Sequence, residues 1–291
     1  MKKTLAVIIV FICFLHAVNA QNELTELKFD TKYFDAVDQY VAFPKKEKDS
    51  TFSIYFIYVD EMAGFSMRFE DQFSINKKGK LKLQPNPDKN TSALIARLNR
   101  NTAFVSVLTN EQKADLQLPK QPEWLKSYKP KDSIDVGYLT KIGYFYNHDG
   151  ASHNAIEPLL KAYKKEPHYK GLEFELGFAY NATKQFSKAI PVLEKALKKD
   201  ENNQLLYKEL GYALVNNKQI DEAEKVYEKG ISISKNIAIK CEMAVNMAQL
   251  LFKENDKIRF KKWAAIARKY GEKTPQYIKY IDYFEAELNK K

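Results

Sequence analysis

The side chains best suited to metal chemistry lie close together near the middle of the chain. Three of the 4 histidines, His148, His153 and His168, fall within this stretch, and Asp149 stands beside the first of them. Imidazole and carboxylate groups both bind transition metals, so a site made by His148, Asp149 and His153 is conceivable. A polar turn accounts for the same residues more simply, and we therefore expect no metal here.

Two pairs of adjacent carboxylates, Asp60–Glu61 and Glu70–Asp71, are candidates for acid–base work. Both pairs fall in strand-like sequence, where neighbouring side chains point to opposite faces, so neither is a natural catalytic dyad. Residues 21–130 contain neither His nor Cys, which excludes Ser–His and Cys–His catalysis and His/Cys zinc sites from that stretch. The chain also lacks the His-Glu-x-x-His, Gly-x-Ser-x-Gly and glycine-rich phosphate-binding motifs. We therefore expect no enzyme activity and no cofactor.

The first twenty residues have the pattern of a secretory signal peptide. Lys2 and Lys3 form a charged start, an apolar run extends from Leu5 to Leu15, and Ala20 offers a small residue at the cleavage position. The run is too short to cross about 30 Å of hydrocarbon as a helix, which argues against a membrane anchor. We expect cleavage after Ala20 and export to the periplasm or the cell exterior, and the two-lysine start is typical of bacteria.

The composition is that of a folded domain with a basic excess. Aromatic residues make up 13% of the chain, enough to fill a core, and the formal net charge is +10. Residues 257–291 hold ten basic and four acidic side chains. Such a tail could meet nucleic acid or an anionic membrane. Its lysines alternate with core-spaced aromatics, however, so we interpret it as a solvated helix face and expect no nucleic acid and no membrane span.

The strongest pattern is an internal repeat in the C-terminal half. Its period is the number of residues in sequence from Gly143 to Gly177. Glycines, alanines and large apolar residues recur at this interval, and each glycine follows an apolar residue. The recurring positions are Gly143, Gly177 and Gly211; Ala155, Ala189 and Ala223; Leu159, Leu193 and Tyr227; and Ala162, Ala196 and Gly230. Apolar spacing of three and four residues predicts two amphipathic helices per unit, with the small residues where the helices cross.

These positions resemble the tetratricopeptide repeat family, whose unit is about 34 residues long, over residues 136–237 as three units. Tyr146 and Tyr180, three residues after their glycines, and Pro167, at the end of the first unit, also match the family pattern. The usual early Trp is absent, and the later units lack the terminal Pro. The resemblance implies a helical solenoid in which neighbouring pairs must stack, because one pair cannot bury its apolar face alone.

The helical pattern continues to the end of the chain in a divergent form. Residues 237–252 and 258–270 are interpreted as a fourth helix pair, in which Cys241 is expected to be a buried small hydrophobe. Pro275 begins a last helix that we expect to cap the stack. We therefore assign residues 131–291 to one helical repeat domain.

Residues 21–130 have a different character and indicate a small α+β domain with a mostly antiparallel sheet. Alternating and β-branched stretches predict its strands, and a short apolar stretch predicts one helix. The predicted strands are 52–59, 65–75, 80–83 and 103–108, the helix is 91–100, and prolines 119, 122 and 130 mark a linker that carries Trp124. No family is recognised in this half.

The family resemblance also implies a binding surface, since the first helix of each unit lines a concave groove in this family. The groove positions carried over are Tyr144, Asn147, Phe174, Phe178, Asn181, Lys208, Tyr212 and Asn216. Aromatic residues in that number are unusual on a surface that binds nothing, and the asparagines could hydrogen-bond an extended peptide. Some members of the family grip a C-terminal carboxylate with a clamp of Lys, Asn and Arg side chains. That clamp is absent here, because the matching positions hold Thr140, Tyr144, Glu175, Leu205 and Glu209.

We therefore expect a non-enzymatic exported scaffold that binds a protein or peptide partner in this groove. One alternative is a glycan-binding or hydrolase-like N-terminal domain that uses the repeats as a docking handle. Another is that the N-terminal domain or the last helix folds over the groove. The sequence names neither the partner nor the oligomeric state.

Overall fold

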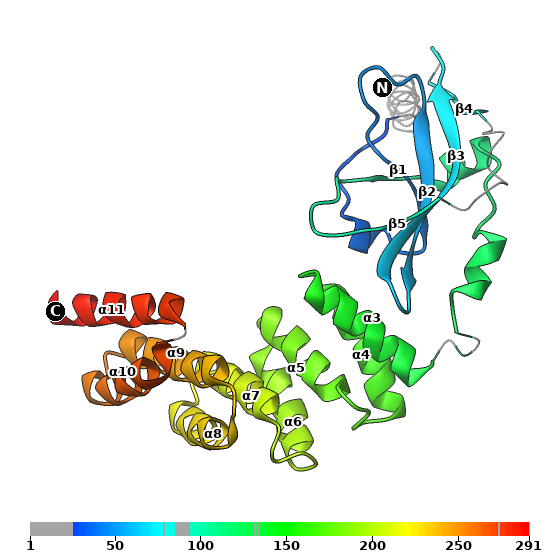
Figure 1. Cartoon of the computed structure of the whole chain (residues 1–291). Helices are drawn as coiled ribbons and strands as arrows, with labels where there is room; N and C mark the ends of the chain where they lie inside the picture. Colours follow the sequence, from blue (N-terminus) through cyan, green and yellow to red (C-terminus); the bar gives the residue numbers. More distant parts are fainter. Residues whose placement is uncertain are drawn as a thin grey trace, which may run out of the picture. The chain divides into compact units, whose positions relative to one another are not determined.

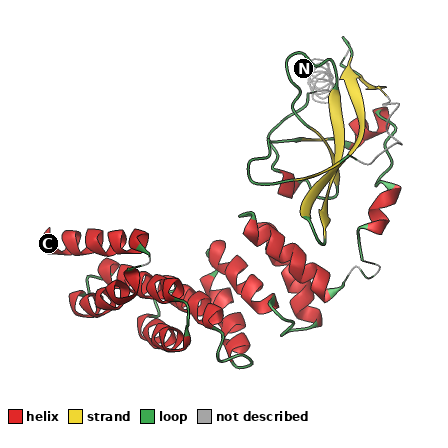
Figure 2. Cartoon of the chain, in the orientation of Figure 1, coloured by secondary structure: helices red, strands yellow, loops and turns green. Residues whose placement is uncertain are grey.

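The computed structural model describes residues 26–77, 79–84, 94–130, 132, 134–272 and 274–290. The chain divides into two compact units between residues 133 and 134. The first unit holds the strands and the second is entirely helical in its described part (Figures 1 and 2). The expected signal peptide, residues 1–20, lies outside the described residues. Each unit is considered by itself below.

The N-terminal unit is built on an antiparallel sheet, as predicted. Its described strands are β1 (Gln39–Ala42), β2 (Phe52–Asp60), β3 (Gly64–Ile75), β4 (Leu81–Gln84), β5 (Ile95–Arg97) and β6 (Ser106–Val107). The strand order is β4-β3-β2-β1-β6, and β5 also pairs with β3. The long β2–β3 hairpin turns at Asp60, whose Oδ1 accepts hydrogen bonds from the backbone N–H groups of Met62 and Ala63 at 2.8 and 2.7 Å. This pairing fixes the register of the sheet.

One face of the sheet carries the main core of this unit. Side chains alternate along a strand, so Phe56 and Tyr58 of β2 share this face and are fully buried. The Trp124 ring lies edge-on to both, with centroids 5.9 and 5.1 Å away, and its Nε1 donates to Glu70 Oε1 at 2.9 Å. The prediction of a linker around Trp124 is therefore wrong: Glu123–Ser127 form a 3₁₀ helix, η3, that packs on the sheet.

The predicted helix at 91–100 is also wrong within the part that the structure describes. Ile95–Arg97 form β5, which pairs antiparallel with β3, while residues 91–93 lie outside the described part. All three β5 side chains are exposed, and nearby only Leu98 is buried. A short apolar run fits either helix or strand. The unpaired edge of β3 decides between them, because it offers hydrogen-bond partners to an extended backbone.

Three short elements escaped the sequence analysis, namely β1, the 3₁₀ helix η1 (Tyr33–Asp35) and the helix α2 (Asn110–Asp115). The start of α2 carries a capping pattern that can be recognised in the sequence. The Thr109 side chain accepts from the Gln112 backbone N–H, and the Gln112 side chain accepts from the Thr109 backbone N–H. This is a capping box, which Thr-x-x-Gln predicts in sequence.

The helical unit consists of successive antiparallel pairs and a last single helix (Figure 1). The helices are α3 (Val136–His148), α4 (Ser152–Lys165), α5 (Leu172–Ala182), α6 (Phe186–Leu197), α7 (Gln204–Asn216), α8 (Ile220–Ile233), α9 (Ile237–Lys253), α10 (Lys257–Gly271) and α11 (Pro275–Lys290). Each first helix packs against its own partner and against the first helix of the next pair. The prediction of a helical solenoid is confirmed.

The turns inside the pairs repeat as regularly as the helices. Gly150, Lys184 and Lys218, each one repeat after the last, all have positive φ angles, at 81°, 60° and 61°. A left-handed residue just after a helix lets the following N–H groups satisfy the last carbonyls. The Gln185 N–H, for example, donates to the Tyr180 carbonyl at 2.7 Å. The turns inside the first three pairs therefore share one geometry.

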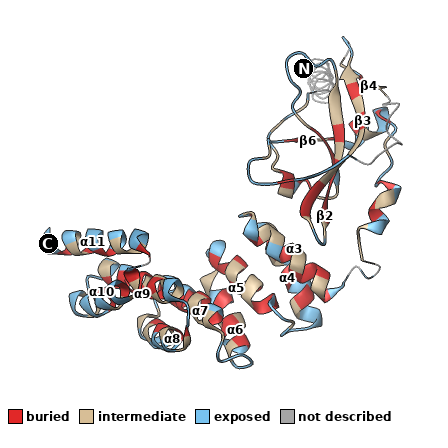
Figure 3. Ribbon diagram, in the orientation of Figure 1, coloured by how far each residue is buried: buried red, intermediate tan, exposed pale blue. Residues whose placement is uncertain are grey.

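The repeating glycines mark the points where the two helices of a pair cross, as predicted. A Cβ added to Gly177 would lie 2.5 Å from Leu193 Cδ2, and one added to Gly211 would lie 2.1 Å from Tyr227 Cε1. Gly143 has the same relation to Leu159, at 2.3 Å from its Cγ. Each large side chain therefore sits directly on a glycine backbone. Figure 3 shows the buried residues concentrated where the helices face one another.

The fourth pair and the last helix complete the core. Cys241, Trp263 and Ile281 are fully buried, which confirms that Cys241 packs as a small hydrophobe and that α9, α10 and α11 share one core. The ring of Phe284 stacks on Phe252 at 4.7 Å, so α11 packs on α9. Among the described residues, no helix combines the length and the apolar character that crossing a lipid bilayer requires.

Gly177→Ala should lower the free energy of unfolding by about 1–3 kcal/mol, because the added methyl group has to displace the Leu193 side chain. Alanine's better helix propensity opposes this by only about 0.5–1 kcal/mol. Urea unfolding followed by circular dichroism measures the difference between the variant and the wild type.

The matched control repeats the substitution in a Leu193→Ala background. The atoms that the new methyl group meets are then absent, so Gly177→Ala should become neutral or slightly stabilising. An equal cost in both backgrounds would contradict the proposed crossing geometry.

Candidate functional site

Three aromatic side chains occupy the same position on the first helices of three successive pairs. Tyr144 on α3, Phe178 on α5 and Tyr212 on α7 are each separated by one repeat. Tyr144 and Tyr212 remain 45% and 37% exposed, and Phe178 is half-buried. Because α3, α5 and α7 pack side by side, the three rings form a row across the helices. We call Tyr144, Phe178 and Tyr212 the aromatic row.

Other predicted groove residues flank this row with different degrees of exposure. The Phe174 ring lies one helical turn from Phe178, with centroids 6.4 Å apart, and is half-buried against the core. Leu205, at the start of α7, is 38% exposed. Thr140 is buried, and its hydroxyl donates to the Val136 carbonyl at 2.7 Å. Phe174 and Leu205 therefore add apolar surface beside the aromatic row.

The predicted asparagines Asn147 and Asn181 face the next helix pair. Asn147 Nδ2 donates to the Glu175 backbone carbonyl and to Glu175 Oε2, at 2.9 and 2.8 Å. Asn181 Nδ2 makes the same two bonds to Glu209, each at 3.0 Å. Both asparagines are buried, and neither Oδ1 has a hydrogen-bond partner among the described residues. Their amide nitrogens thus link neighbouring pairs, and peptide binding by these side chains stays a prediction.

The third pair makes the equivalent link with a lysine. Asn216 is exposed and donates to the Tyr212 carbonyl of its own helix at 2.8 Å. Lys208 instead reaches across to α9, with its Nζ 3.4 Å from Glu242 Oε1 and 3.3 Å from Glu209 Oε1. Lys208 is thus tied to two carboxylates. It joins the third pair to the fourth as the asparagines join the earlier ones.

The glutamates that receive these links form a second row, which the sequence analysis missed. Glu175, Glu209 and Glu242 lie at equivalent positions of α5, α7 and α9, and Glu242 falls just one position short of a full repeat after Glu209. We call these three residues the glutamate row. The regular spacing was visible in the sequence. The structural role of these glutamates was not visible in the sequence, because a Glu on a helix usually faces solvent and the partners here lie on another helix.

Burial shapes the ionisation of this row. Burial raises the pKa of Glu175; the hydrogen bond from Asn147 partly offsets this, and the charge of Glu209 reinforces it. Burial alone would lower the pKa of Lys208, but Glu209 and Glu242 outweigh it, so that this pKa is raised. Lys208 therefore stays a cation. The carboxylates of the row are held close enough together to influence one another.

A family model agrees with the repeat geometry. The family model described as Tetratricopeptide repeat matches residues 181–239, which include the Asn181 link, the Gly211 crossing and the turn at Lys218. Residues 181–239 thus match a tetratricopeptide repeat, and the helix pairs together form a tetratricopeptide-like solenoid. No curated protein matches the chain.

Among solved structures, several of the protein MamA are similar to part of this chain. One, titled "MamA MSR-1 C2", is 21% identical with a TM-score of 0.45, and covers 52% of this chain and 84% of its own. Another, of residues 41 to the end from Desulfovibrio magneticus RS-1, is 20% identical with a TM-score of 0.44, and covers 51% and 81%. A third, titled "Crystal structure of MamA", is 25% identical with a TM-score of 0.45, and covers 53% and 85%.

Two histidines in or next to the first helix pair, His148 and His168, have local roles. The His148 ring stacks on Tyr144, with centroids 5.8 Å apart. His168, whose φ angle is +75°, pairs through Nδ1 with Glu173 Oε1. Within the described ranges, no three His, Cys, Asp or Glu side chains gather as a metal ion would require.

The carboxylate pairs of the N-terminal unit are likewise engaged in structure. Asp60 holds the β2–β3 turn and Glu70 receives the Trp124 N–H. Asp71 is buried, and its Oδ1 accepts from the Gln72 backbone N–H at 3.0 Å. Asp60, Glu70 and Asp71 thus each have a separate local task.

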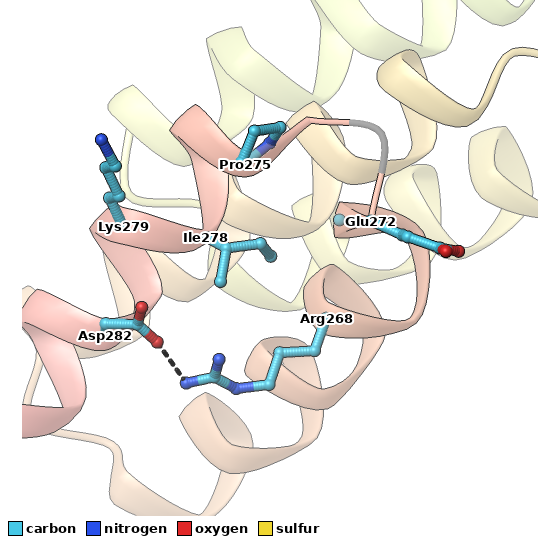
Figure 4. A pocket seen from close by; sticks show the side chains of 7 residues that line it. Arg268, Glu272, Pro275, Ile278, Lys279 and Asp282 are labelled. Atoms are coloured by element: carbon cyan, nitrogen blue, oxygen red, sulfur yellow. Dashed lines mark ion pairs between the residues drawn. The ribbon is translucent and has the colours of Figure 1, made fainter.

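A surface cleft of about 500 Å³ lies between α10 and α11 (Figure 4). Arg268 lines it and points toward Asp282, with an ion pair of 2.7 Å, and also pairs with Glu285 at 2.6 Å. Ile278 fills the base of the cleft, where a Cβ on Gly271 would meet it at 2.0 Å. Because its arginine already holds two carboxylates, we interpret this cleft as the packing seam of the cap.

Asn181→Ala should destabilise the helical array by about 1–3 kcal/mol, because it removes the two buried hydrogen bonds that Asn181 donates to the Glu209 carboxylate and carbonyl. Asn216→Ala is the matched control. That asparagine is exposed and bonds only within its own helix, so its loss should cost less than about 0.5 kcal/mol. Urea unfolding of both variants measures the contrast, and equal effects would exclude a special role for the Asn181–Glu209 link.

Glu175→Gln should change how stability depends on pH. A carboxyl whose pKa is higher in the folded state binds more protons there, so stability falls as pH rises from its ordinary value of 4.5 through its raised value. Glutamine keeps an acceptor for Asn147 but does not titrate. The variant should therefore gain stability over the wild type as pH rises through this window, and the gain should vanish below it.

Unfolding midpoints between about pH 4 and pH 8 give this difference directly. Glu194→Gln is the control, because Glu194 is exposed on α6 and its replacement removes the same formal charge. A Glu175→Gln curve parallel to the wild type throughout would show that burial does not perturb this carboxyl.

Proposed function

We propose that this protein is an exported, non-enzymatic scaffold that holds a segment of a partner protein against the first helices of its tetratricopeptide repeats. The proposed contact surface contains the aromatic row with Phe174, Leu205 and Lys208. Export rests on the signal-peptide pattern of residues 1–20. The repeats support the role of a protein-interaction scaffold, because arrays of this kind offer an extended surface built from successive helices.

The observation that carries the proposal is the exposure of Tyr144 and Tyr212, which are 45% and 37% exposed at equivalent positions. Leaving a large ring partly in water forgoes the stabilisation of full burial, about 25 cal/mol per Å² of apolar surface. Aligned repetition of such rings favours a contact surface. Tyrosine suits that task, because it supplies a large amphipathic contact area at a small cost in side-chain entropy.

The last helix leaves Tyr144 and Tyr212 of this surface exposed within the helical unit. α11 packs against α9 and α10, and Tyr144 and Tyr212 remain exposed in the unit as a whole. This leaves α3, α5 and α7 as the first helices on which a partner segment would lie. The alternative in which the last helix covers the aromatic row thus has less support.

The rival function assigns glycan binding or hydrolysis to the N-terminal unit, and the geometry there supports it less. Phe43, Tyr55 and Phe69 do form a row of half-buried rings on one face of the sheet. Neighbouring rings in this row cross at 75° and 76°. They therefore meet edge-to-face and do not make the flat platform on which a sugar ring would stack.

Photo-crosslinking tests the proposed surface. A photoreactive phenylalanine replaces Tyr212 in the full chain, expressed in the cells that naturally make it. We expect one or a few defined crosslinked partners, and we expect their yield to fall when Tyr144→Ala is added, because the two rings would contact the same segment.

The control places the same photoreactive residue at Ile258 on α10, which is 85% exposed. If exposure alone governed crosslinking, this position would give the higher yield. Defined partners from position 258 and none from position 212 would move the contact surface away from the first helices.

A further inference from the structure

The aromatic row and the glutamate row run side by side across the same helices. On α5, Glu175 and Phe178 are three residues apart, and on α7 the same spacing separates Glu209 and Tyr212. Residues at this spacing are neighbours on one helix face. A carboxylate therefore lies beside an aromatic ring on each of two successive helices. Since α5 and α7 pack together, the pairs form a two-by-two arrangement.

The charge on this stretch is negative. Glu175, Glu209 and Glu242 contribute three carboxylates, and Lys208 lies between the last two as the ammonium that pairs with them. The side-chain partner of Glu175 is the neutral amide of Asn147. Lys141 holds the equivalent position on α3, so the acidic stretch begins at α5. This contrasts with the chain as a whole, which has a formal net charge of +10.

Two of these carboxylates remain within reach of a ligand. The Glu209 side chain is only 6% exposed and is held by Asn181 and Lys208. Glu242 is 31% exposed at its side chain, and Glu175 is half-buried. A partner would therefore contact Glu175 and Glu242 directly. The charge of Glu209 would act on it only through longer-range electrostatics.

We propose that the first-helix face takes an extended partner segment that carries Lys or Arg side chains about every third residue, with its cations placed over the aromatic row and against Glu175 and Glu242. This inference rests on the proposed function and names the chemistry of its partner. A cation above a ring and beside a carboxylate gains from both contacts. An acidic segment would meet repulsion from the same groups.

The spacing follows from the packing of the helices. Adjacent packed helices lie about 8–10 Å apart, so equivalent side chains on α5, α7 and α9 repeat at about that distance. A segment in the polyproline II conformation rises about 3.1 Å per residue with three residues per turn. Every third side chain then falls on one face about 9 Å from the last, which matches the helix spacing. A β-strand offers one face every second residue, about 7 Å apart, and matches less well.

Fluorescence anisotropy with dye-labelled peptides and the full chain tests this partner class. The probes are four Lys-Pro-Pro triplets, the same peptide with Glu or with Gln for Lys, and a peptide of equal composition in which the lysines are paired. We expect the Lys triplet peptide to bind about tenfold tighter than the Glu and Gln peptides. It should also bind about threefold tighter than the rearranged peptide and weaken as salt rises.

The doubly substituted protein Glu175→Gln, Glu242→Gln should lose about fivefold to tenfold in affinity for the Lys peptide. Glu194→Gln on α6 should lose nothing. Circular dichroism confirms that each variant is folded. The inference is overturned if the Glu or Gln peptide binds as tightly as the Lys peptide, if none of the probes binds, or if the double variant binds unchanged.

The crosslinking experiment separates this inference from the proposed function. Defined partners at position 212 together with no preference for the Lys peptide would keep the scaffold function and remove the cationic partner. Crosslinks from position 212 to a second copy of this chain, not displaced by the Lys peptide, would assign the face to self-association and overturn the inference.

Discussion

The close crossing of two helices at a glycine is the constraint on which the helical unit depends. Leu193 sits on Gly177 and Tyr227 on Gly211, so near that no side chain fits between them. This contact fixes how the helices of one pair meet. Similar pairs then stack with their first helices side by side, which places equivalent residues in rows. The aromatic and glutamate rows thus follow from the way in which the underlying helices pack.

The links between pairs add polar specificity to this apolar stack. Burying a carboxylate is costly unless hydrogen bonds compensate, and Asn147 and Asn181 supply two bonds each to the next unit. Each link reaches a residue of the following repeat, so it forms only when the stacking register is correct. The stability of such an array is approximately a sum of unit and neighbour terms. These links therefore strengthen the neighbour terms on the same face that carries the aromatic row.

The sequence predicted the helical unit well because its determinants are local and periodic. A constant repeat interval reveals the glycine crossings, the turns and the aromatic row without any structure. The roles of Asn147 and Asn181 were harder to predict, because their hydrogen-bond partners lie in the next repeat. An Asn considered alone is expected to face solvent. The predictions for β5 and for the segment around Trp124 failed for a related reason. The open edge of β3 decides the structure of β5, and the aromatic rings of the sheet decide that of the Trp124 segment. Both partners are distant in sequence.

The two rows couple stability to binding through electrostatics. Burial raises the pKa of Glu175, and the nearby charge of Glu209 adds to this effect, so the folded array holds two carboxylates whose charges repel. A cationic segment on this face would offset that repulsion while its aliphatic stems cover the exposed rings. Any ligand that binds only the folded state stabilises it by mass action. A partner with the proposed charge would therefore tighten the stacking of the repeats that bind it, whereas an acidic segment would add to the repulsion it meets.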